Sequence, residues 1–419
     1  AKQVPFAIGM TLDEAMKLSK PLREMYASDE KLHSLIDTAK ALEGMPRHAS
    51  TRAAGVVITE RPVYEYVPLA RNDESIVTQY TMTTLEHLGL LKMDFLGLRN
   101  LTVLEDAAEM VRRRQPGFDI AAVPEDDKET FAMLSAGKTE GVFQLESTGI
   151  TAVCTGLKPK SIEDITAVIA LYRPGPMDSI PRFLECSAHP EKISYKHPLL
   201  EPILSVTYGC IVYQEQVIEI FRRLAGFSLG QADMIRRAMS KKKHAVIDAE
   251  RQAFIHGDPE RGIPGCVANG VDEATANSIY DEILDFASYA FNKAHAVAYA
   301  VVAYRTAYMK CHWPCEYMAA LLTSVLDSTT KVAEYISECR EMGIKVLPPD
   351  VNESDARFTV VGGNIRFGLV AIKNIGERFI ELLMQERREN GPFTGFEEFC
   401  RRMSGKELNR RAVESLIKA

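Results

Sequence analysis

Residues 91–96 read Leu-Lys-Met-Asp-Phe-Leu, a short apolar run that contains one lysine and one aspartate. Residues 55–58 read Gly-Val-Val-Ile, and both runs have the length and composition of short buried strands. Turn-forming residues gather between them around Arg71-Asn72-Asp73. The pattern therefore predicts a fragment of a β-sheet within residues 53–98.

Most of the remaining sequence has helical spacing. Residues 11–14 read as a capping box, and apolar side chains then repeat over residues 32–42 until Gly44 offers a helix stop. From Leu101 onward the apolar pattern is mostly helical, and a second strand-like stretch falls within residues 352–368. We expect an α+β fold that is mostly helical over residues 101–351, with strands largely confined to residues 53–98 and 352–368.

The bulk composition excludes several classes of protein. The 419 residues carry a formal net charge of -7, so any nucleic-acid-binding surface must be local. There is no secretory signal, and the most apolar helical run, residues 296–304, is far shorter than the ~20 residues that a bilayer needs. We expect a soluble protein with no membrane partner, divided into two to four domains at roughly 150 residues each. The final predicted helix, residues 409–419, has no capping signal at the end of the chain, which favours truncation at both ends.

The eight cysteines are scattered and include no Cys-x-x-Cys pair, which favours a reducing, cytoplasmic setting over a disulfide framework. Cys311 and Cys315 are the closest pair, and His312 lies between them. No second cluster of ligands lies nearby in sequence to complete four-coordinate zinc. We interpret these cysteines as structural thiols.

Asp94 is the first candidate for chemistry. An acid in an apolar strand must be desolvated, paired or bound to a cation, and a solvent-facing edge strand is the alternative. Lys92 points to the same face of the strand, because side chains alternate. This pair suits a site for Mg²⁺ and phosphate, although an ordinary ion pair has the same sequence.

Basic residues are concentrated in residues 236–243, which contain Arg236, Arg237 and the three lysines Lys241, Lys242 and Lys243. A solvated helix end is the ordinary explanation of such a run. Phosphate binding is the sharper hypothesis, because two adjacent guanidiniums can make bidentate contacts with phosphate oxygens.

Two further segments combine cations with stiff or aromatic sequence. Tyr289 begins a turn in which Asn292, Lys293 and His295 bring amide, ammonium and imidazole groups close together. Rings with nearby donors fit a nucleotide, though tyrosines at helical spacing more often pack at the core boundary. Arg173 directly precedes a stiff Pro-Gly-Pro turn. It either binds a phosphate or is simply part of the loop that forms this turn.

A predicted helix pair flanks Asn374-Ile375-Gly376, in the manner of a helix-hairpin-helix motif that holds a DNA phosphate on backbone N–H groups. Asn374 stands where the usual Gly-hydrophobic-Gly hairpin has its first glycine, and many turns that bind nothing look the same.

Eight motifs, taken in order, resemble the alpha subunits of bacterial DNA polymerase III, the replicative C-family DNA polymerases. They are Arg47-His48-Ala49-Ser50-Thr51 with residues 53–58, Lys92-Met93-Asp94-Phe95-Leu96-Gly97-Leu98, Gly141-Val142-Phe143-Gln144-Leu145-Glu146-Ser147, Tyr172-Arg173-Pro174-Gly175-Pro176, Tyr213-Gln214-Glu215-Gln216, Arg236-Arg237-Ala238-Met239, Phe291-Asn292-Lys293-Ala294-His295 and Leu347-Pro348-Pro349-Asp350. The resemblance covers essentially the whole chain. It implies a helical thumb remnant at 1–44, a palm segment at 45–98, fingers at 99–350 and a truncated helix-hairpin-helix region at 351–419.

The resemblance also implies a chemistry, namely addition of dNTPs to a primer 3′-OH on template DNA. The palm is of the nucleotidyltransferase type seen in polymerase beta, where three aspartates bind two Mg²⁺ ions. Asp94 matches the third. The other two form an Asp-x-Asp motif that is absent from this sequence.

By the same resemblance, Lys92, Arg236 and Arg237 contact the triphosphate, and the turn from Tyr289 to His295 contacts base and sugar. Arg52 stands where a His is frequent, and Ser240 where many members have Gly. The implied partners are primer-template DNA, dNTP, the sliding clamp, a proofreading exonuclease and the clamp loader. An error-prone C-family paralogue, or a non-catalytic DNA- and nucleotide-binding module, is the alternative.

Overall fold

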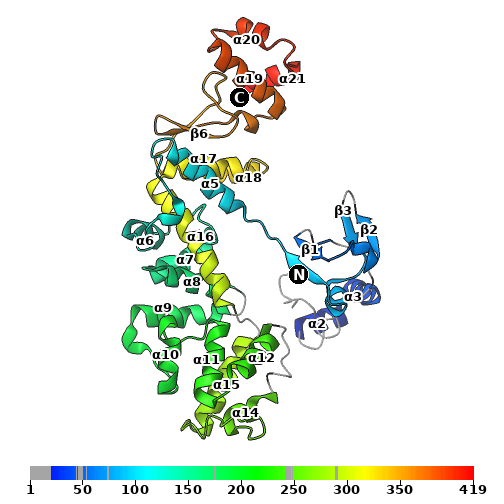
Figure 1. Ribbon diagram of the computed structural model, residues 1–419, viewed down its shortest axis with the longest axis vertical. Coiled ribbons are helices and arrows are strands. Elements are labelled where there is room, and N and C mark those ends of the chain that lie inside the picture. Colours follow the sequence, from blue (N-terminus) through cyan, green and yellow to red (C-terminus); the bar gives the residue numbers. More distant parts are fainter. Residues whose placement is uncertain are drawn as a thin grey trace. The chain divides into compact units, whose positions relative to one another are not determined.

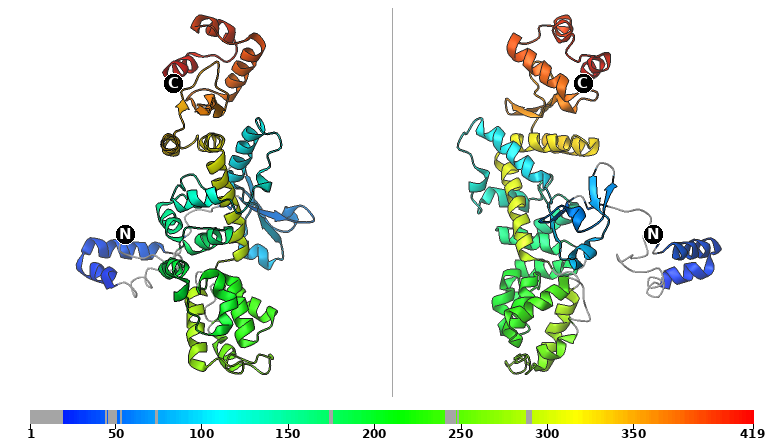
Figure 2. Two further views of the ribbon diagram at one scale, coloured as in Figure 1. Left: turned by 90° about the vertical axis from the view of Figure 1, so that its left-hand side faces the viewer. Right: turned by 45° about the vertical axis from the view of Figure 1, so that its right-hand side comes forward.

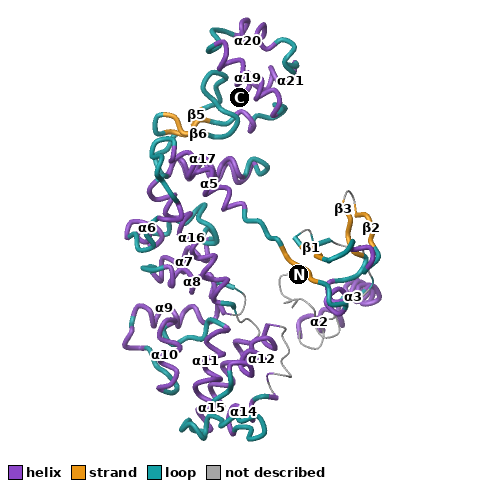
Figure 3. The backbone as a smooth tube through the Cα atoms, viewed as in Figure 1, coloured by secondary structure: helices purple, strands orange, loops and turns teal. Residues whose placement is uncertain are grey.

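The computed structural model describes residues 20–43, 45, 51–52, 54–72, 75–173, 176–240, 247, 249–287 and 291–419. The chain divides into two units, residues 1–97 and residues 98–419 (Figure 1). The described part is mostly helical and its strands form small sheets (Figure 3), which confirms the predicted α+β, mostly helical class. The predicted capping box at residues 11–14 and the helix stop at Gly44 lie outside the described residues.

The first unit combines short helices with two strand ribbons. Its elements are α2 (Lys20–Ser28), α3 (Glu30–Leu42), β1 (Gly55–Ile58), η1 (Val63–Glu65), β2 (Leu69–Asn72), β3 (Ser75–Thr78), α4 (Met82–His87) and β4 (Leu91–Asp94). β1 pairs with β4 and β2 pairs with β3, both antiparallel. The two predicted strands are present, although the second ends at Asp94. The turn predicted at Arg71-Asn72-Asp73 is only partly placed, because Arg71 and Asn72 belong to strand β2 of the β2–β3 hairpin and Asp73 lies outside the described residues.

The β1–β4 ribbon has two unlike faces, because successive side chains of a strand point to opposite sides. The pairing register aligns Val57 with Lys92 and Gly55 with Asp94, so the polar pair shares one face. The other face carries four exposed apolar side chains, Val56, Ile58, Leu91 and Met93. Exposed apolar surface on a two-stranded ribbon is typical of a sheet that packs against further structure.

The second unit is dominated by helices. They are α5 (Arg99–Arg112), α6 (Lys128–Ser135), α7 (Thr148–Leu157), α8 (Ile162–Leu171), α9 (Ile180–Ala188), α10 (Glu201–Leu204), α11 (Gln214–Ala225), α12 (Leu229–Ser240), α14 (Arg251–His256), α15 (Glu273–Ala287), α16 (Lys293–His312), α17 (Pro314–Ser324) and α18 (Thr329–Glu341). Single 3₁₀ turns are η2 (Ile120–Ala122), η3 (Pro176–Ser179), η4 (Pro190–Lys192), η5 (Pro198–Leu200) and η6 (Ser205–Thr207).

Helix α16 organises this unit, since it packs against α5, α6, α8 and α17 (Figure 1). Its buried side chains include Ala296, Ala300, Ala303 and Ala307, which are spaced three or four residues apart and therefore share one face. Small side chains on one face allow a neighbouring helix to approach closely. A separate apolar core lies around α11, α14 and α15, where the rings of Phe221, Phe254 and Tyr280 pack together, and α12 packs on α11.

The C-terminal part begins with a three-stranded sheet in the order β5 (Val346–Leu347), β7 (Asn364–Arg366), β6 (Thr359–Val361). Then come η7 (Leu369–Ala371), α19 (Glu377–Asn390), α20 (Phe396–Met403) and α21 (Arg410–Lys418), which lie together in both views of Figure 2. β6 and β7 lie in the predicted strand region, whereas β5 falls just before it. The helix predicted before Asn374 is only a 3₁₀ turn, because few residues remain between the end of β7 and Asn374.

None of the helices in the described ranges is both long enough and apolar enough to cross a membrane.

Candidate nucleotide, metal and DNA sites

Asp94 is the last residue of strand β4, and each of its carboxylate oxygens contacts a cationic side chain. Nζ of Lys92 lies 2.7 Å from Oδ1, and an Nη2 atom of Arg52 lies 3.1 Å from Oδ2. The carboxylate is one-third exposed, at 34%, whereas the Lys92 side chain is 14% exposed. The strand alternation placed Lys92 and Asp94 on one face as predicted, and the structure adds Arg52, whose role the sequence left open.

Both cations favour the ionised form of Asp94. Hydrogen bonds from Arg52 and then from Lys92 hold the pKa of the Asp94 carboxyl below its ordinary value. An ionised, accessible carboxylate is the form that binds a divalent cation. Within the described ranges, Asp94 belongs to no group of three ligand side chains, so it offers one ligand and not a complete metal site.

The two predicted arginines of α12 converge on one acid. Nε of Arg236 lies 2.7 Å from Oδ1 of Asp233, and Nε of Arg237 lies 2.8 Å from Oδ2. Hydrogen bonds from Arg236 and Arg237 lower the pKa of the Asp233 carboxyl. Asp233 therefore fixes the stems of both arginines side by side, and the Arg237 side chain stays 70% exposed. The predicted lysines Lys241, Lys242 and Lys243 lie outside the described residues.

The turn before α16 has a definite structural basis. The Asn292 side chain caps α16 by accepting a hydrogen bond of 2.9 Å from the backbone N–H of His295. The backbone N–H of Lys293 donates to the carboxylate of Glu215, and its ammonium lies 2.5 Å from Oε1 of Glu163. Asn292 and Lys293 therefore shape this turn. Tyr289, also predicted here, lies outside the described residues.

His295 and Arg173 line the same cavity, of about 720 Å³, in the second unit. The His295 ring lies 4.2 Å from the Tyr299 ring, and the Arg173 guanidinium lies 4.4 Å from the centre of the Phe291 ring. Aromatic faces beside cations are suited to a stacked base and its phosphates. The structure thus brings together Arg173 and His295, which are far apart in the sequence.

The wall of this cavity also contains residues to which the sequence assigned no role. Gln144 lines it with a backbone φ of 62°, and the ring of Phe143 lies 5.2 Å from the ring of Tyr299. Gly141, at φ 71°, has no room for a side chain, because a β-carbon there would lie 2.6 Å from Cδ2 of Leu321. The glycine at position 141 is the sequence signal that could have drawn attention to this wall of the cavity, because a left-handed backbone favours glycine.

The predicted hairpin turn is built on Asn374, whose φ is 64°. Asparagine tolerates this left-handed conformation better than most residues, so it can replace the usual glycine. Gly376 is the N-cap of α19, and a side chain at this position would meet no atom within 4 Å. Residues 376–378 are exposed and Gly376 has no capping side chain, which leaves the first backbone N–H groups of α19 available to a phosphate.

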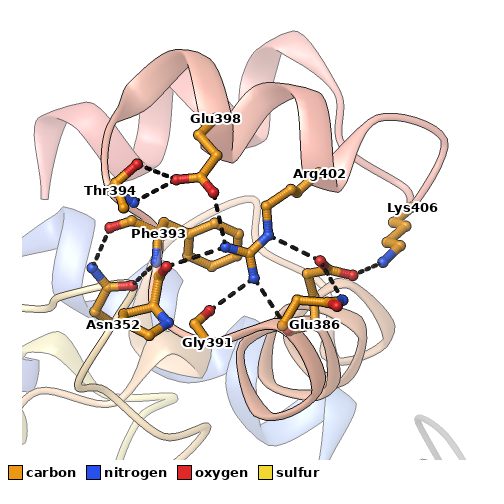
Figure 4. A network of polar contacts seen from close by, with 10 residues as sticks. Asn352, Glu386, Gly391, Phe393, Thr394, Glu398, Arg402 and Lys406 are labelled. Atoms are coloured by element: carbon orange, nitrogen blue, oxygen red, sulfur yellow. Dashed lines mark hydrogen bonds and ion pairs between the residues drawn. The ribbon is translucent and has the colours of Figure 1, made fainter.

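A partly buried ion network joins helices α19 and α20 (Figure 4). Nε of Arg402 in α20 lies 2.9 Å from Oε1 of Glu386 in α19, and Lys406 also pairs with Glu386. The Arg402 guanidinium covers the Phe393 ring at 4.2 Å and donates to the backbone carbonyls of Gly391 and Pro392. Hydrogen bonds from Lys406 and Arg402 lower the pKa of Glu386 to about 2.

Three family models match the chain in turn. Residues 1–97 match the bacterial DNA polymerase III alpha NTPase domain, residues 100–262 the finger domain of the same subunit, and residues 343–419 a helix-hairpin-helix motif. All of the chain aligns with DNA polymerase III subunit alpha of Thermus aquaticus at 47% identity and of Bacillus subtilis at 45%, covering 34% and 37% of those proteins. The Staphylococcus aureus subunit is 42% identical over 99% of the chain and 38% of its own length.

These matches define the class, the alpha subunits of bacterial DNA polymerase III. The chain belongs to the DNA polymerase III alpha subunit family, and it spans little more than a third of the length of these relatives.

Proposed function

We propose that this chain forms the finger-centred part of a DNA-directed DNA polymerase that replicates a bacterial chromosome. The reaction is attack of a primer 3′-OH on the α-phosphate of a dNTP, with release of pyrophosphate. The observation that carries this proposal is the ionised Asp94 between Lys92 and Arg52, in the residues that match the family's NTPase domain. Asp233 and Glu386 also hold two cations each, so the place of Asp94 at a strand end in the segment that matches the NTPase domain is what favours a metal ligand here.

In the proposed reaction, Asp94 would supply one oxygen ligand to Mg²⁺, and Lys92 would contact the triphosphate. Two bound Mg²⁺ ions would activate the primer hydroxyl and stabilise the leaving group. One carboxylate is insufficient for both ions, and no Asp-x-Asp pair occurs in the sequence. The exposed apolar face of β1–β4 supports the same idea, because further palm strands would cover it.

The other residues proposed to bind the nucleotide belong to the second unit. Arg236 and Arg237 would hold the triphosphate, because Asp233 keeps two guanidiniums adjacent without covering Arg237. His295 would contact the base or sugar from the wall of the cavity. Tyr289 is proposed to line the same turn, while Asn292 and Lys293 act mainly by holding its shape.

DNA binding is assigned to Arg173, to the lysines at 241–243, which lie outside the described residues, and to the Asn374–Gly376 turn at the exposed start of α19. We propose that the whole protein works in the bacterial cytoplasm with primer-template DNA, a sliding clamp, a proofreading exonuclease and a clamp loader. The thumb, palm, fingers and hairpin boundaries at residues 44, 98 and 350 remain part of this proposal.

Primer extension separates this function from a DNA- and nucleotide-binding module without catalysis. An alpha subunit carrying this sequence should extend a primed template with dNTPs and Mg²⁺. The 419-residue chain alone should not extend it, because the Asp-x-Asp pair is missing. Extension by the chain alone, at a rate near that of the complete subunit, would overturn the proposed metal site.

A further inference from the structure

We propose that Asp127, Cys311 and His312 form a binding site for one Zn²⁺ ion in the second unit. A carboxylate oxygen, a thiol sulfur and a ring nitrogen of these residues lie within 4.8 Å of one another. Asp127 immediately precedes α6, and Cys311 and His312 end α16. The three side chains therefore converge from segments that are remote in sequence.

The Asp127 carboxylate is held in place and keeps one oxygen available. Oδ2 accepts hydrogen bonds from the backbone N–H of Thr130 at 2.8 Å and from its hydroxyl at 2.6 Å, and lies 2.9 Å from Nε2 of His312. The two Thr130 contacts cap α6, and all three contacts use Oδ2. No hydrogen bond to Oδ1 is found among the described residues, so a metal ion bound to Oδ1 and Nε2 would replace the contact with His312 and keep the cap.

Neighbouring rings fix the remaining parts of the site. The His312 ring lies 4.4 Å from the ring of Tyr308, one helical turn earlier. The Tyr304 hydroxyl accepts from the backbone N–H of Asp127 at 3.1 Å and donates to the carbonyl of Pro124. Orientation of ligands by a second layer of contacts is typical of protein metal sites.

The donor set selects the metal. Thiolate and imidazole bind borderline-soft zinc well and are poor ligands for Mg²⁺ or Ca²⁺, which take oxygen. Zinc with three protein ligands completes its tetrahedron with water. On binding, the S–H bond of Cys311 breaks, an S–Zn bond forms and the proton passes to solvent. With Zn–ligand bonds of about 2.0 to 2.3 Å, a tetrahedral site places its ligand atoms about 3 to 4 Å apart. The ligand atoms here lie within 4.8 Å of one another, so side-chain movements of about 1 Å would complete the geometry.

The bound ion would join the beginning of α6 to the end of α16. It would therefore stabilise the second unit at a point where Tyr304 already connects α16 to the preceding loop. This site is independent of the polymerase proposal, because neither Asp94 nor the α12 arginines take part.

The test is metal binding to the purified 419-residue chain under reducing conditions, with Co²⁺ as a spectroscopic probe and Zn²⁺ by equilibrium dialysis. We expect one Zn²⁺ per chain, and a thiolate-to-cobalt charge-transfer band that Zn²⁺ abolishes. Cys311→Ser should remove the charge-transfer band and weaken Zn²⁺ binding about tenfold to a hundredfold. His312→Gln should weaken Zn²⁺ binding to a similar extent. A Co²⁺ ion held by the first unit alone, where Asp94 lies, would give no such band, since residues 1–97 contain no cysteine.

Cys315→Ser is the matched control, because Cys315 lies beside the same helix end but contacts the Gly363 carbonyl and is outside the cluster. This variant should keep both the band and the affinity. The proposal is overturned if the parent chain binds no Zn²⁺, or if Cys315→Ser loses as much binding as Cys311→Ser. Should Cys311→Ser misfold, by circular dichroism, the Asp127→Asn and His312→Gln variants decide, and unchanged zinc affinity in both rejects the site.

Discussion

Gly55 lies directly opposite Asp94 in the β1–β4 ribbon, and a β-carbon at position 55 would stand 3.2 Å from Oδ1 of Asp94. The missing side chain leaves room for a carboxylate that Arg52 and Lys92 already flank. The position of the candidate metal ligand therefore depends on a glycine in a neighbouring strand.

Gly55→Ala should displace the Asp94 carboxylate by a few tenths of an ångström or more. We expect primer extension by an alpha subunit carrying this sequence to fall about tenfold or more, because small misplacements of catalytic groups are costly. Thermal unfolding should change little. Gly97→Ala is the control, since a β-carbon there meets no atom within 4 Å. Equal extension rates for Gly55→Ala and the parent would show that this contact does not matter.

Arg237→Ala should raise the apparent KM for dNTPs about tenfold to a hundredfold, because one charge-assisted bidentate contact is worth about 1.5 to 3 kcal/mol. Arg237→Lys should rescue this loss only in part, since an ammonium lacks the planar fork. The measurement is steady-state extension against dNTP concentration.

Arg223→Ala serves as the control for Arg237→Ala. Arg223 is half exposed and pairs with Glu219 four residues earlier, just as Arg237 pairs with Asp233. If both variants leave KM unchanged, the α12 arginines are a solvated helix end. If both raise it equally, the effect is a general one of lost helix ion pairs.

Glu386 should make the stability of the C-terminal helices depend on pH. Its folded pKa of about 2 lies below the ordinary value of 4.5, so its contribution is complete above about 4.5 and is lost as the pH falls toward 2. The difference in urea midpoint between the parent and Glu386→Gln should therefore be largest at neutral pH and shrink below about pH 4.5.

Glu389→Gln, on the same helix, is the matched control for this titration, because Glu389 contacts only the neutral Gln385 among the described side chains. It should shift the midpoint little at any pH. A Glu386→Gln difference that stays constant from neutral pH to pH 3 would contradict the role assigned to the Arg402 and Lys406 pairs.

Substitutions at Asn374 separate backbone geometry from side-chain chemistry. Asn374→Gly should retain DNA affinity, because glycine adopts the positive φ of 64° without strain. Asn374→Val should cost about 1 to 2 kcal/mol in stability and weaken DNA binding, since a β-branched residue resists this conformation. Fluorescence anisotropy with primer-template DNA measures the DNA affinity of both variants. Loss of affinity in Asn374→Gly as large as in Asn374→Val would mean that the side chain itself binds DNA.

Local sequence patterns predicted the features that depend on neighbours along the chain. The apolar runs at residues 55–58 and 91–94 are strands, and alternation placed Lys92 beside Asp94. The β2–β3 hairpin was missed because its strands, Leu69–Asn72 and Ser75–Thr78, mix polar and apolar residues and lack the apolar runs that indicated β1 and β4.

Features that depend on distant pairing could not be predicted in this way. Arg52 reaches Asp94 because the pairing register of β1 and β4 brings the ends of these strands together. The sequence of either strand alone does not determine that register. The absence of a nearby second ligand argued against zinc at Cys311, yet folding brings in Asp127. Strand register decides the first contact and helix packing the second, and sequence spacing shows neither.

The most direct measurement is single-turnover dNTP incorporation by an alpha subunit carrying Asp94→Asn, with Glu86→Gln, on the exposed side of α4, as the control. Asparagine keeps the size of the side chain but removes the charge that binds a metal ion. We expect incorporation to fall at least about a hundredfold while affinity for primer-template DNA stays nearly unchanged, and Glu86→Gln to behave as the parent. Incorporation by Asp94→Asn at the parent's rate would contradict the assignment of Asp94 as a catalytic metal ligand.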